Sequence, residues 1–232
     1  MERLDKIIVS QTEYSRKQVK EMIKKGKITV NGEIIFKSDI KIDSQNAEIK
    51  IDGTKIDIKK HIYLVLNKPK GYISATEDKS AKTVLDLVPE KYLYRELFPV
   101  GRLDKDTTGL MIITDDGEFS HNILSPKKHI KKTYNVIIDI EMTEEMVDGF
   151  KNGIVLNDGK CKESILKITG KNSGIVILTE GRYHQIKRMF GCYEAKVLEL
   201  QRIGMGNFTL PDDLELGQCR ELKNEELEKI KE

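Results

Sequence analysis

The chain has 232 residues, of which 34% are charged and 38% hydrophobic, and its net charge is +2. This composition excludes a fully disordered chain, and no apolar run approaches the roughly 18 residues that a membrane helix needs. The three cysteines, at positions 161, 192 and 219, lie far apart, and the four histidines are also scattered. We therefore expect neither a disulfide framework nor a structural metal site. Because the N-terminus has no signal-peptide pattern, we expect a cytoplasmic location.

The charge is unevenly distributed along the chain. Residues 1–61 carry a net charge of +4, residues 62–211 carry +2, and residues 212–232 carry −4. An acidic tail thus offsets a mildly basic body, which weakly favours a polyanionic partner, although many other proteins share this balance. Within the tail, residues 224–231 predict a surface helix without an assigned role.

The N-terminal residues predict a small module of two helices and a hairpin. A first helix is expected near residues 3–10. Ser15 can cap the start of a second, amphipathic helix, and Gly26 can adopt the left-handed conformation that ends it. Residues 27–35 alternate around an Asn-Gly pair, which is a strong signal for a two-residue hairpin turn.

Basic side chains repeat along one face of this second helix. They are Arg16, Lys17, Lys20 and Lys24. Such a ridge is either a solvated helix face or a set of phosphate contacts, which give sequence-independent, salt-sensitive affinity. The capped basic helix and the hairpin make residues 1–58 resemble an S4 RNA-binding domain, and the resemblance implies that the ridge contacts RNA. Residues 59–61 are then a short linker.

Residues 62–232 alternate between apolar strands and amphipathic helices, with a turn at Lys68-Pro69-Lys70-Gly71. Strands are expected at 62–67, 72–74, 110–114, 132–138, 164–169, 174–180 and 197–203. Helices are expected at 83–88, 118–124, 143–152 and 184–193. Because turns of hairpin type join several of the strands, the pattern predicts an α+β fold with a mixed, largely antiparallel central sheet.

A polar loop between Gly101 and Gly109 carries Asp104 just before an apolar strand. Catalytic groups commonly lie on loops that a rigid element positions, but an aspartate in such a loop is also a common turn former. Arg102 stands two residues earlier, so in an extended segment it projects to the same side. It would contact a phosphate or support a displaced nucleotide, or else form a structural salt bridge.

Two further segments carry candidate residues. The basic run at 127–132 includes Lys127 and Lys128 and precedes Tyr134, which either stacks on an unpaired base, worth roughly 1–3 kcal/mol, or belongs to the core. Lys187 and Arg188 are adjacent cations on a predicted helix that follows a glycine turn. A cation beside a shielded carboxylate would keep it ionised and nucleophilic, whereas the alternative is a surface basic pair.

Together these segments resemble, in the same order, three motifs of the pseudouridine synthases, which isomerise uridine in RNA. The matching stretches are Gly101–Asp104 with Thr107–Leu110, Lys132–Tyr134, and Glu180–Lys187. Leu66–Gly71 matches the opening strand and loop of the same catalytic domain. With an S4 domain before it, the chain resembles the RsuA family, the branch that also includes RluB, RluE and RluF, and it is most similar to the members that modify 16S ribosomal RNA.

The resemblance implies roles for individual side chains. Asp104 would be the catalytic nucleophile or base, Tyr134 would stack beneath the uracil, and Lys187 would pair with Asp104. The substrate-binding residues would be Arg102, Leu103, Arg182, Ile186 and Arg188. Whether Asp104 attacks C1′, attacks the ring or removes a sugar proton stays open. Some relatives carry arginine where this chain has Lys187, and lysine cannot make the bidentate contact.

The resemblance also implies a reaction and a partner. A uridine of 16S rRNA, at the family position uridine-516, would be isomerised by N-glycosidic bond cleavage, base rotation and C–C rejoining, without cofactor or metal. The partner would be 16S rRNA or a small-subunit assembly intermediate, and the protein would be a monomer. Alternatives are the same chemistry on 23S rRNA, a non-catalytic rRNA-binding or assembly protein, and a hydrolase that uses Asp104 with His184.

Overall fold

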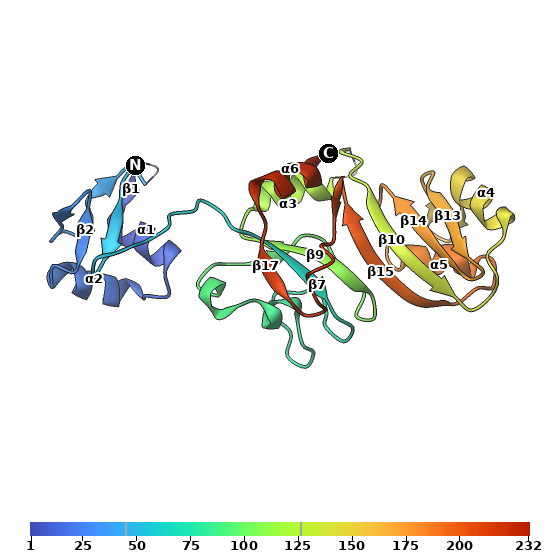
Figure 1. The fold of residues 1–232 in the computed structure, drawn as a ribbon, viewed down its shortest axis with the longest axis horizontal. Helices are drawn as coiled ribbons and strands as arrows, with labels where there is room; N and C mark the ends of the chain where they lie inside the picture. Colours follow the sequence, from blue (N-terminus) through green and yellow to red (C-terminus); the bar gives the residue numbers. More distant parts are fainter. Residues whose placement is uncertain (45, 126) are drawn as a thin grey trace. The chain divides into compact units, whose positions relative to one another are not determined.

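The structure is a computed structural model that describes residues 1–44, 46–125 and 127–232. The chain forms two compact units (Figure 1). The first contains Met1–Ile62 and Val88–Glu96, and the second contains Tyr63–Leu87 and Leu97–Glu232. In the described part of the chain, no helix combines the length and apolar character needed to cross a bilayer.

The first unit packs two helices against a small sheet. Its helices are α1 (Leu4–Gln11) and α2 (Arg16–Lys24). Its four-stranded sheet has the order β3 (Glu33–Ile34), β2 (Ile28–Val30), β5 (Ile49–Ile51) and β6 (Thr54–Lys55), and β1 (Glu2–Arg3) pairs separately with β4 (Lys41–Ile42). The predicted cap is present, because the Ser15 hydroxyl accepts from the Gln18 amide and the Gln18 side chain accepts from the Ser15 amide. Segment 88–96, which includes the short helix η2 (Glu90–Tyr92), joins this unit through the Arg95 guanidinium, which donates to Gln11 and to the Lys59 carbonyl.

The second unit is built on a nine-stranded mixed sheet. Along its main path the strands are β13 (Ile165–Gly170), β14 (Ser173–Leu178), β10 (Lys132–Ile138), β15 (Val197–Met205), β9 (Thr108–Thr114), β7 (Tyr63–Lys68) and β17 (Cys219–Glu221). The short strands β8 (Phe98–Pro99) and β16 (Phe208–Thr209) pair with β9 and β15. Among the pairings of described strands in this sheet, β15 with β9 is parallel and the others are antiparallel. The predicted α+β fold is confirmed.

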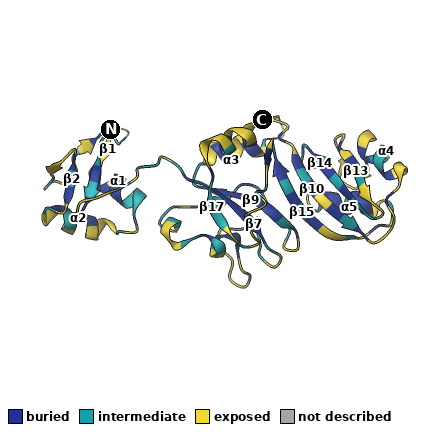
Figure 2. Cartoon of the chain, viewed as in Figure 1, coloured by how far each residue is buried: buried dark blue, intermediate teal, exposed yellow. Residues whose placement is uncertain are grey.

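Helices lie beside the sheet (Figure 1), and the central strands of the sheet are largely buried (Figure 2). The helices are α3 (Gly117–Leu124), α4 (Glu144–Asn152), α5 (Gln185–Gly191) and α6 (Asn224–Lys231). The side chains of α3 and α6 share one apolar core with Val65 and Ile112 of the central strands. Phe150 of α4 packs against Phe190 of α5, with ring centroids 4.9 Å apart. This second contact holds α5, which carries part of the candidate site.

The parallel contact between β9 and β15 needs a glycine. Gly109 has φ +99°, and a Cβ atom there would lie 2.2 Å from the carbonyl oxygen of Arg202. The glycine that closes the Asp104 loop is therefore also the residue that lets β15 approach β9.

Two predicted elements differ from the structure. The strand expected at 72–74 is wrong, because Ile73 makes only an isolated bridge with Thr83. Residues 83–88 contain a 3₁₀ helix, η1 (Val84–Leu87), rather than a regular α-helix. The reason is visible in the backbone: Gly71 turns with φ +93°, and the Ser74 hydroxyl binds the Asp104 loop, so this segment follows the loop and does not extend the sheet.

Candidate active site

The loop that carries Asp104 is anchored by a buried lysine at the end of β7. Lys68 is 0% exposed, and its Nζ donates to the carbonyl oxygens of Thr107 at 2.8 Å, Asp104 at 3.0 Å, Pro69 at 3.2 Å and Lys105 at 3.3 Å. A buried ammonium needs such acceptors to replace its water. The loop backbone is thus wrapped around a single charged group.

This environment changes the acidity of Lys68. Burial lowers its pKa to about 8, although the nearby charges of Asp106 and Asp104 oppose the shift. At neutral pH the side chain is still mainly an ammonium with three donor hydrogens. The sequence drew attention to the turn at 68–71, but the role of its first lysine was missed.

A second attachment fixes the other side of the loop. The Leu103 amide donates to the Ser74 hydroxyl, and this hydroxyl donates back to the Leu103 carbonyl, both at 2.9 Å. The Gly71 amide donates to the Lys105 carbonyl at 2.8 Å. Asp104 is therefore flanked by backbone that is fixed on both sides, as a catalytic group requires.

The carboxylate of Asp104 lies against two side chains from the start of α5. Lys187 Nζ is 3.0 Å from Oδ2, and His184 Nε2 is 3.4 Å from Oδ1. Lys187 Nζ also lies 2.6 Å from Oδ1 of Asp106. The expected meeting of position 104 with a cation from the 180s is thus present. The sequence missed Asp106 as a second partner of that cation.

These contacts keep Lys187 charged. Burial acts to lower its pKa, but the hydrogen bonds and charges of Asp106 and Asp104 outweigh it, so the pKa of Lys187 lies above its usual value. The hydrogen bond from Lys187 likewise lowers the pKa of Asp106, against the opposing effect of burial. The lysine therefore stays positive beside Asp104 at neutral pH.

His184 precedes α5 in an uncommon backbone conformation. Its φ is 47° and its ψ is 35°, in the left-handed region, and its ring stacks on that of Tyr183 at 3.8 Å between centroids. Non-glycine residues in this region are uncommon and cluster at functional sites. The sequence had offered His184 only as the partner of Asp104 in the alternative hydrolase, and it gave no sign of this backbone conformation.

Asp104, His184 and Lys187 line a cavity of about 610 Å³. Its lining includes all three residues predicted to be catalytic, Asp104, Tyr134 and Lys187. Of the predicted substrate-binding residues it includes Arg102, Leu103, Arg182 and Ile186. Two further cations, Lys132 and Arg202, also line it, and the sequence had not singled out either as a functional residue. The only signal for Arg202 was a charge within an apolar strand.

Comparisons with known proteins show the family of the chain. The sequence model for RNA pseudouridylate synthase matches residues 62–191, and that for the S4 domain matches residues 2–42. The chain is 37% identical, over 232 residues, to the ribosomal small subunit pseudouridine synthase A of Escherichia coli (strain K12), covering 98% of this chain and 99% of that protein. The chain belongs to the RsuA-type RNA pseudouridine synthases.

Two further relatives support the assignment. An RNA pseudouridine synthase of Bacillus subtilis (strain 168) is 37% identical over 235 residues, which cover 99% of this chain and 98% of the relative. A crystal structure of a pseudouridylate synthase aligns with 99% of this chain and 100% of its own, with a TM-score of 0.70 and 34% identity. The resemblance thus extends to the whole two-unit chain, and the chain is an RNA pseudouridine synthase enzyme.

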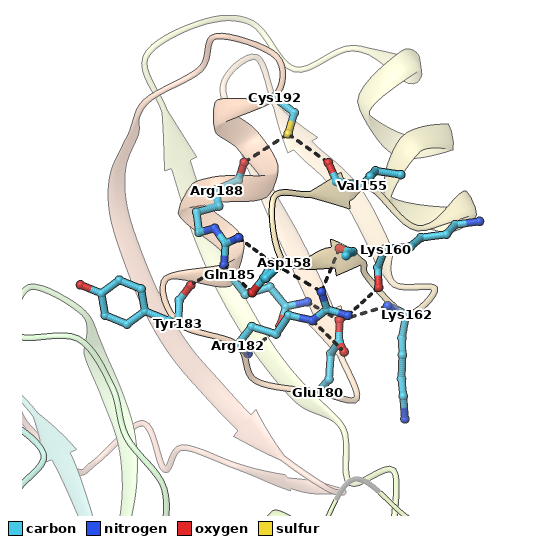
Figure 3. Close-up of polar contacts among 11 residues, drawn as sticks. Val155, Asp158, Lys160, Lys162, Glu180, Arg182, Tyr183, Gln185, Arg188 and Cys192 are labelled. Atoms are coloured by element: carbon cyan, nitrogen blue, oxygen red, sulfur yellow. Dashed lines mark hydrogen bonds and ion pairs between the residues drawn. The ribbon is translucent and has the colours of Figure 1, made fainter.

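In this pseudouridine synthase, two arginines near the start of α5 form hydrogen bonds with a small hairpin (Figure 3). The hairpin consists of β11 (Val155–Leu156) and β12 (Gly159–Lys160). Arg182 donates to the Gly159 carbonyl at 2.9 Å and to the Lys160 carbonyl. Arg188 contacts both carboxylate oxygens of Asp158, at 2.6 and 3.1 Å. Arg188 is thus directed to the hairpin, whereas Lys187 is directed to Asp104.

The residues predicted to bind RNA outside the cavity are all exposed. Arg16, Lys17, Lys20 and Lys24 lie on α2 of the first unit. Lys127 and Lys128 lie in the loop before β10, and Lys128 lines a separate hollow of about 330 Å³ with Tyr63. Exposure leaves these side chains available to a polyanion, and their role in RNA binding remains a prediction.

Proposed function

We propose that this pseudouridine synthase isomerises a uridine of 16S rRNA, at the position that the family modifies as uridine-516. The observation that carries the proposal is the ion pair between Asp104 and Lys187 inside a cavity that Tyr134 also lines. Relatives named as small-subunit enzymes match nearly the full chain, which favours 16S over 23S rRNA.

The cavity supports a mechanism on a displaced nucleotide. Its volume of about 610 Å³ lies within the range of small-molecule sites, and a base inside a duplex must be flipped out before an enzyme reaches it. Tyr134 would stack on the uracil, and Arg102, exposed at the cavity, would support the displaced nucleotide. Lys187 would hold the Asp104 carboxylate at the N1–C1′ bond.

The reaction is an isomerisation, so the substrate uridine and the product pseudouridine contain the same atoms. The N1–C1′ bond breaks, the uracil turns, and C5 bonds to C1′ while the C5 proton leaves and N1 gains a proton. Asp104 would act as a nucleophile towards C1′ or the uracil ring, or as a base towards a sugar proton. No cofactor is part of this scheme.

The remaining parts would deliver the RNA. We assign the S4 RNA-binding domain to residues 1–58, the linker to residues 59–61 and the catalytic domain to residues 62–232. The basic face of α2, with Lys127 and Lys128, would bind rRNA or a small-subunit assembly intermediate. The protein would act as a monomer in the cytoplasm.

Replacing Lys20 and Lys24 by alanine should weaken rRNA binding and lower the magnitude of the salt-dependence slope by roughly 1.5, because two phosphate contacts are lost. The slope would be measured by filter binding across a salt series. The control replaces Lys223 and Lys229, which are exposed at the acidic helix α6 and lie outside the hollow that Lys128 lines. Equal slopes for the α2 variant and the wild type would remove these lysines from the RNA surface.

The substrate is tested by incubating the protein with 16S and 23S rRNA transcripts, both naked and in assembly intermediates, and mapping pseudouridine by primer extension. We expect one new site in 16S rRNA. Modification of 23S rRNA alone would favour the alternative substrate. Absence of pseudouridine in every RNA, with RNA binding intact, would favour a non-catalytic assembly protein.

A further inference from the structure

Lys132 is a buried cation that the reaction scheme above does not use. It begins β10, is only 9% exposed, and lines the cavity with Asp104. Alternate residues of a strand point to one side, so Lys132 and Tyr134 share the face that lines the cavity. Within the described part of the chain its ammonium makes no hydrogen bond or ion pair. The nitrogen is not among the fully enclosed polar atoms that lack a partner, so the ammonium is open to the cavity and available to a ligand.

Its surroundings add positive charge. Arg202, 2% exposed, stands directly opposite Tyr134 in the register of β10 and β15. Its Nε donates to the Leu110 carbonyl at 2.7 Å, and its other hydrogen bond within the described residues is a long one to the Met111 sulfur. Burial, followed by the charge of Arg202, lowers the pKa of Lys132.

One carboxylate lies near enough to oppose this effect, but it is engaged elsewhere. Glu180 accepts at Oε1 from the Gln185 side chain at 2.6 Å and from the Lys162 amide at 3.0 Å. Its Oε2 lies 3.4 Å from Arg182. The carboxylates of the cavity therefore do not fully neutralise the positive charge of its lysine and arginine side chains. Such a cavity favours a ligand that becomes negatively charged.

The reaction supplies such a ligand. When the N1–C1′ bond breaks, its electron pair stays on the uracil and spreads over N1, O2 and O4; attack on the ring would also place negative charge on a carbonyl oxygen. We propose that Lys132 is a further catalytic residue, whose ammonium donates a hydrogen bond to a uracil carbonyl oxygen and stabilises this anion. Lys132 stays protonated throughout, and the electron pair is used again in the C5–C1′ bond. This inference rests on the proposed function.

The first test compares Lys132→Met with Lys131→Met. Lys131 is exposed and directly precedes β10. Under single-turnover conditions we expect Lys132→Met to slow pseudouridine formation by about 100-fold, as when one preorganised donor is removed, and to leave RNA affinity within about twofold. Lys131→Met should react at the wild-type rate. A Lys132→Met rate within about threefold of wild type would overturn the proposal.

Thermal unfolding separates this role from a structural one. Removing an unpaired buried charge should leave the melting temperature unchanged or raise it, because methionine fills the same space without a desolvation cost. A lower melting temperature together with weaker RNA binding would mean that Lys132 only supports the fold, and would overturn the proposal.

Atom substitution in the RNA provides the sharpest test. Sulfur accepts hydrogen bonds more weakly than oxygen. Two transcripts would therefore be compared, one with 2-thiouridine and one with 4-thiouridine at the target. The wild-type protein should react more slowly with the transcript whose sulfur replaces the oxygen that Lys132 contacts. The same transcript should cause no further loss with Lys132→Met. Equal thio effects in both proteins would overturn the contact. A wild-type protein that forms no pseudouridine on any rRNA would overturn the proposed function itself, and with it this inference.

Discussion

Asp104→Asn is expected to lower the rate of pseudouridine formation by at least about 1,000-fold, because asparagine has the shape of aspartate but neither its negative charge nor its basicity. RNA affinity should change by less than about threefold, since the variant removes no cation from the binding surface. The rate would be measured at saturating protein on an rRNA transcript, and the affinity by filter binding at the same salt concentration.

Asp106→Asn is the matched control. Both carboxylates contact the ammonium of Lys187, at 3.0 and 2.6 Å, but the side chain of Asp106 is 68% exposed and that of Asp104 is 26% exposed. An exposed ion pair contributes little, so Asp106→Asn should slow the reaction by less than about tenfold. If the two variants lost activity equally, the rate would depend on the ion-pair network around Lys187, and the carboxylate of Asp104 would have no special role in catalysis.

Lys68→Met is expected to lower the free energy of unfolding by about 2–4 kcal/mol, because the carbonyl oxygens around the ammonium lose their donor while buried. Turnover should fall by about 100-fold, since a shift of about 1 Å in the Asp104 loop is enough to do so. Urea unfolding and single-turnover rates would measure the two effects. Lys70→Met, at an exposed position two residues later, is the control and should change neither.

The effect of Lys68 on stability also depends on pH. Its pKa is about 8 in the folded protein and 10.5 for an ordinary lysine. Between these values the unfolded chain binds more protons, so raising the pH favours the folded state. Below about pH 8 the stability difference between wild type and Lys68→Met should be constant, and it should grow as the pH rises towards 10.5. A difference that stays flat across this window would show that the buried lysine does not titrate there.

The elements with strong local patterns were predictable from the sequence. Strand β10 begins and ends at the expected residues, 132 and 138, because it is rich in β-branched and aromatic residues and its buried positions alternate with more exposed ones. Helix α6 likewise covers the expected residues 224–231. The short edge strand β17 was missed, because three residues with two charges carry no strand pattern, and its pairing with β7 is decided by contacts distant in sequence.

The candidate site was predictable only in part. The sequence indicated Asp104 and Lys187, because each lies in a recognisable loop or helix start, and the fold brings them together across 83 positions. The role of Lys68 was hidden because a lysine before proline looks like an ordinary exposed turn residue, and its burial depends on carbonyl groups 36–39 residues away. Charge alone also gave no means to tell a buried Arg202 from a surface one.

The most direct test of the central claim, that the cavity around Asp104 exchanges the N1 bond of a uridine for a C5 bond, is tritium release from rRNA. A 16S rRNA transcript labelled with tritium at uridine C5 is incubated with the wild-type protein, and the released tritium is measured at the plateau. Bond formation at C5 expels that hydrogen, so we expect tritium equivalent to one uridine for each RNA molecule, and none with Asp104→Asn. RNA that is bound but keeps all its tritium, on 16S and 23S transcripts alike, would contradict the account.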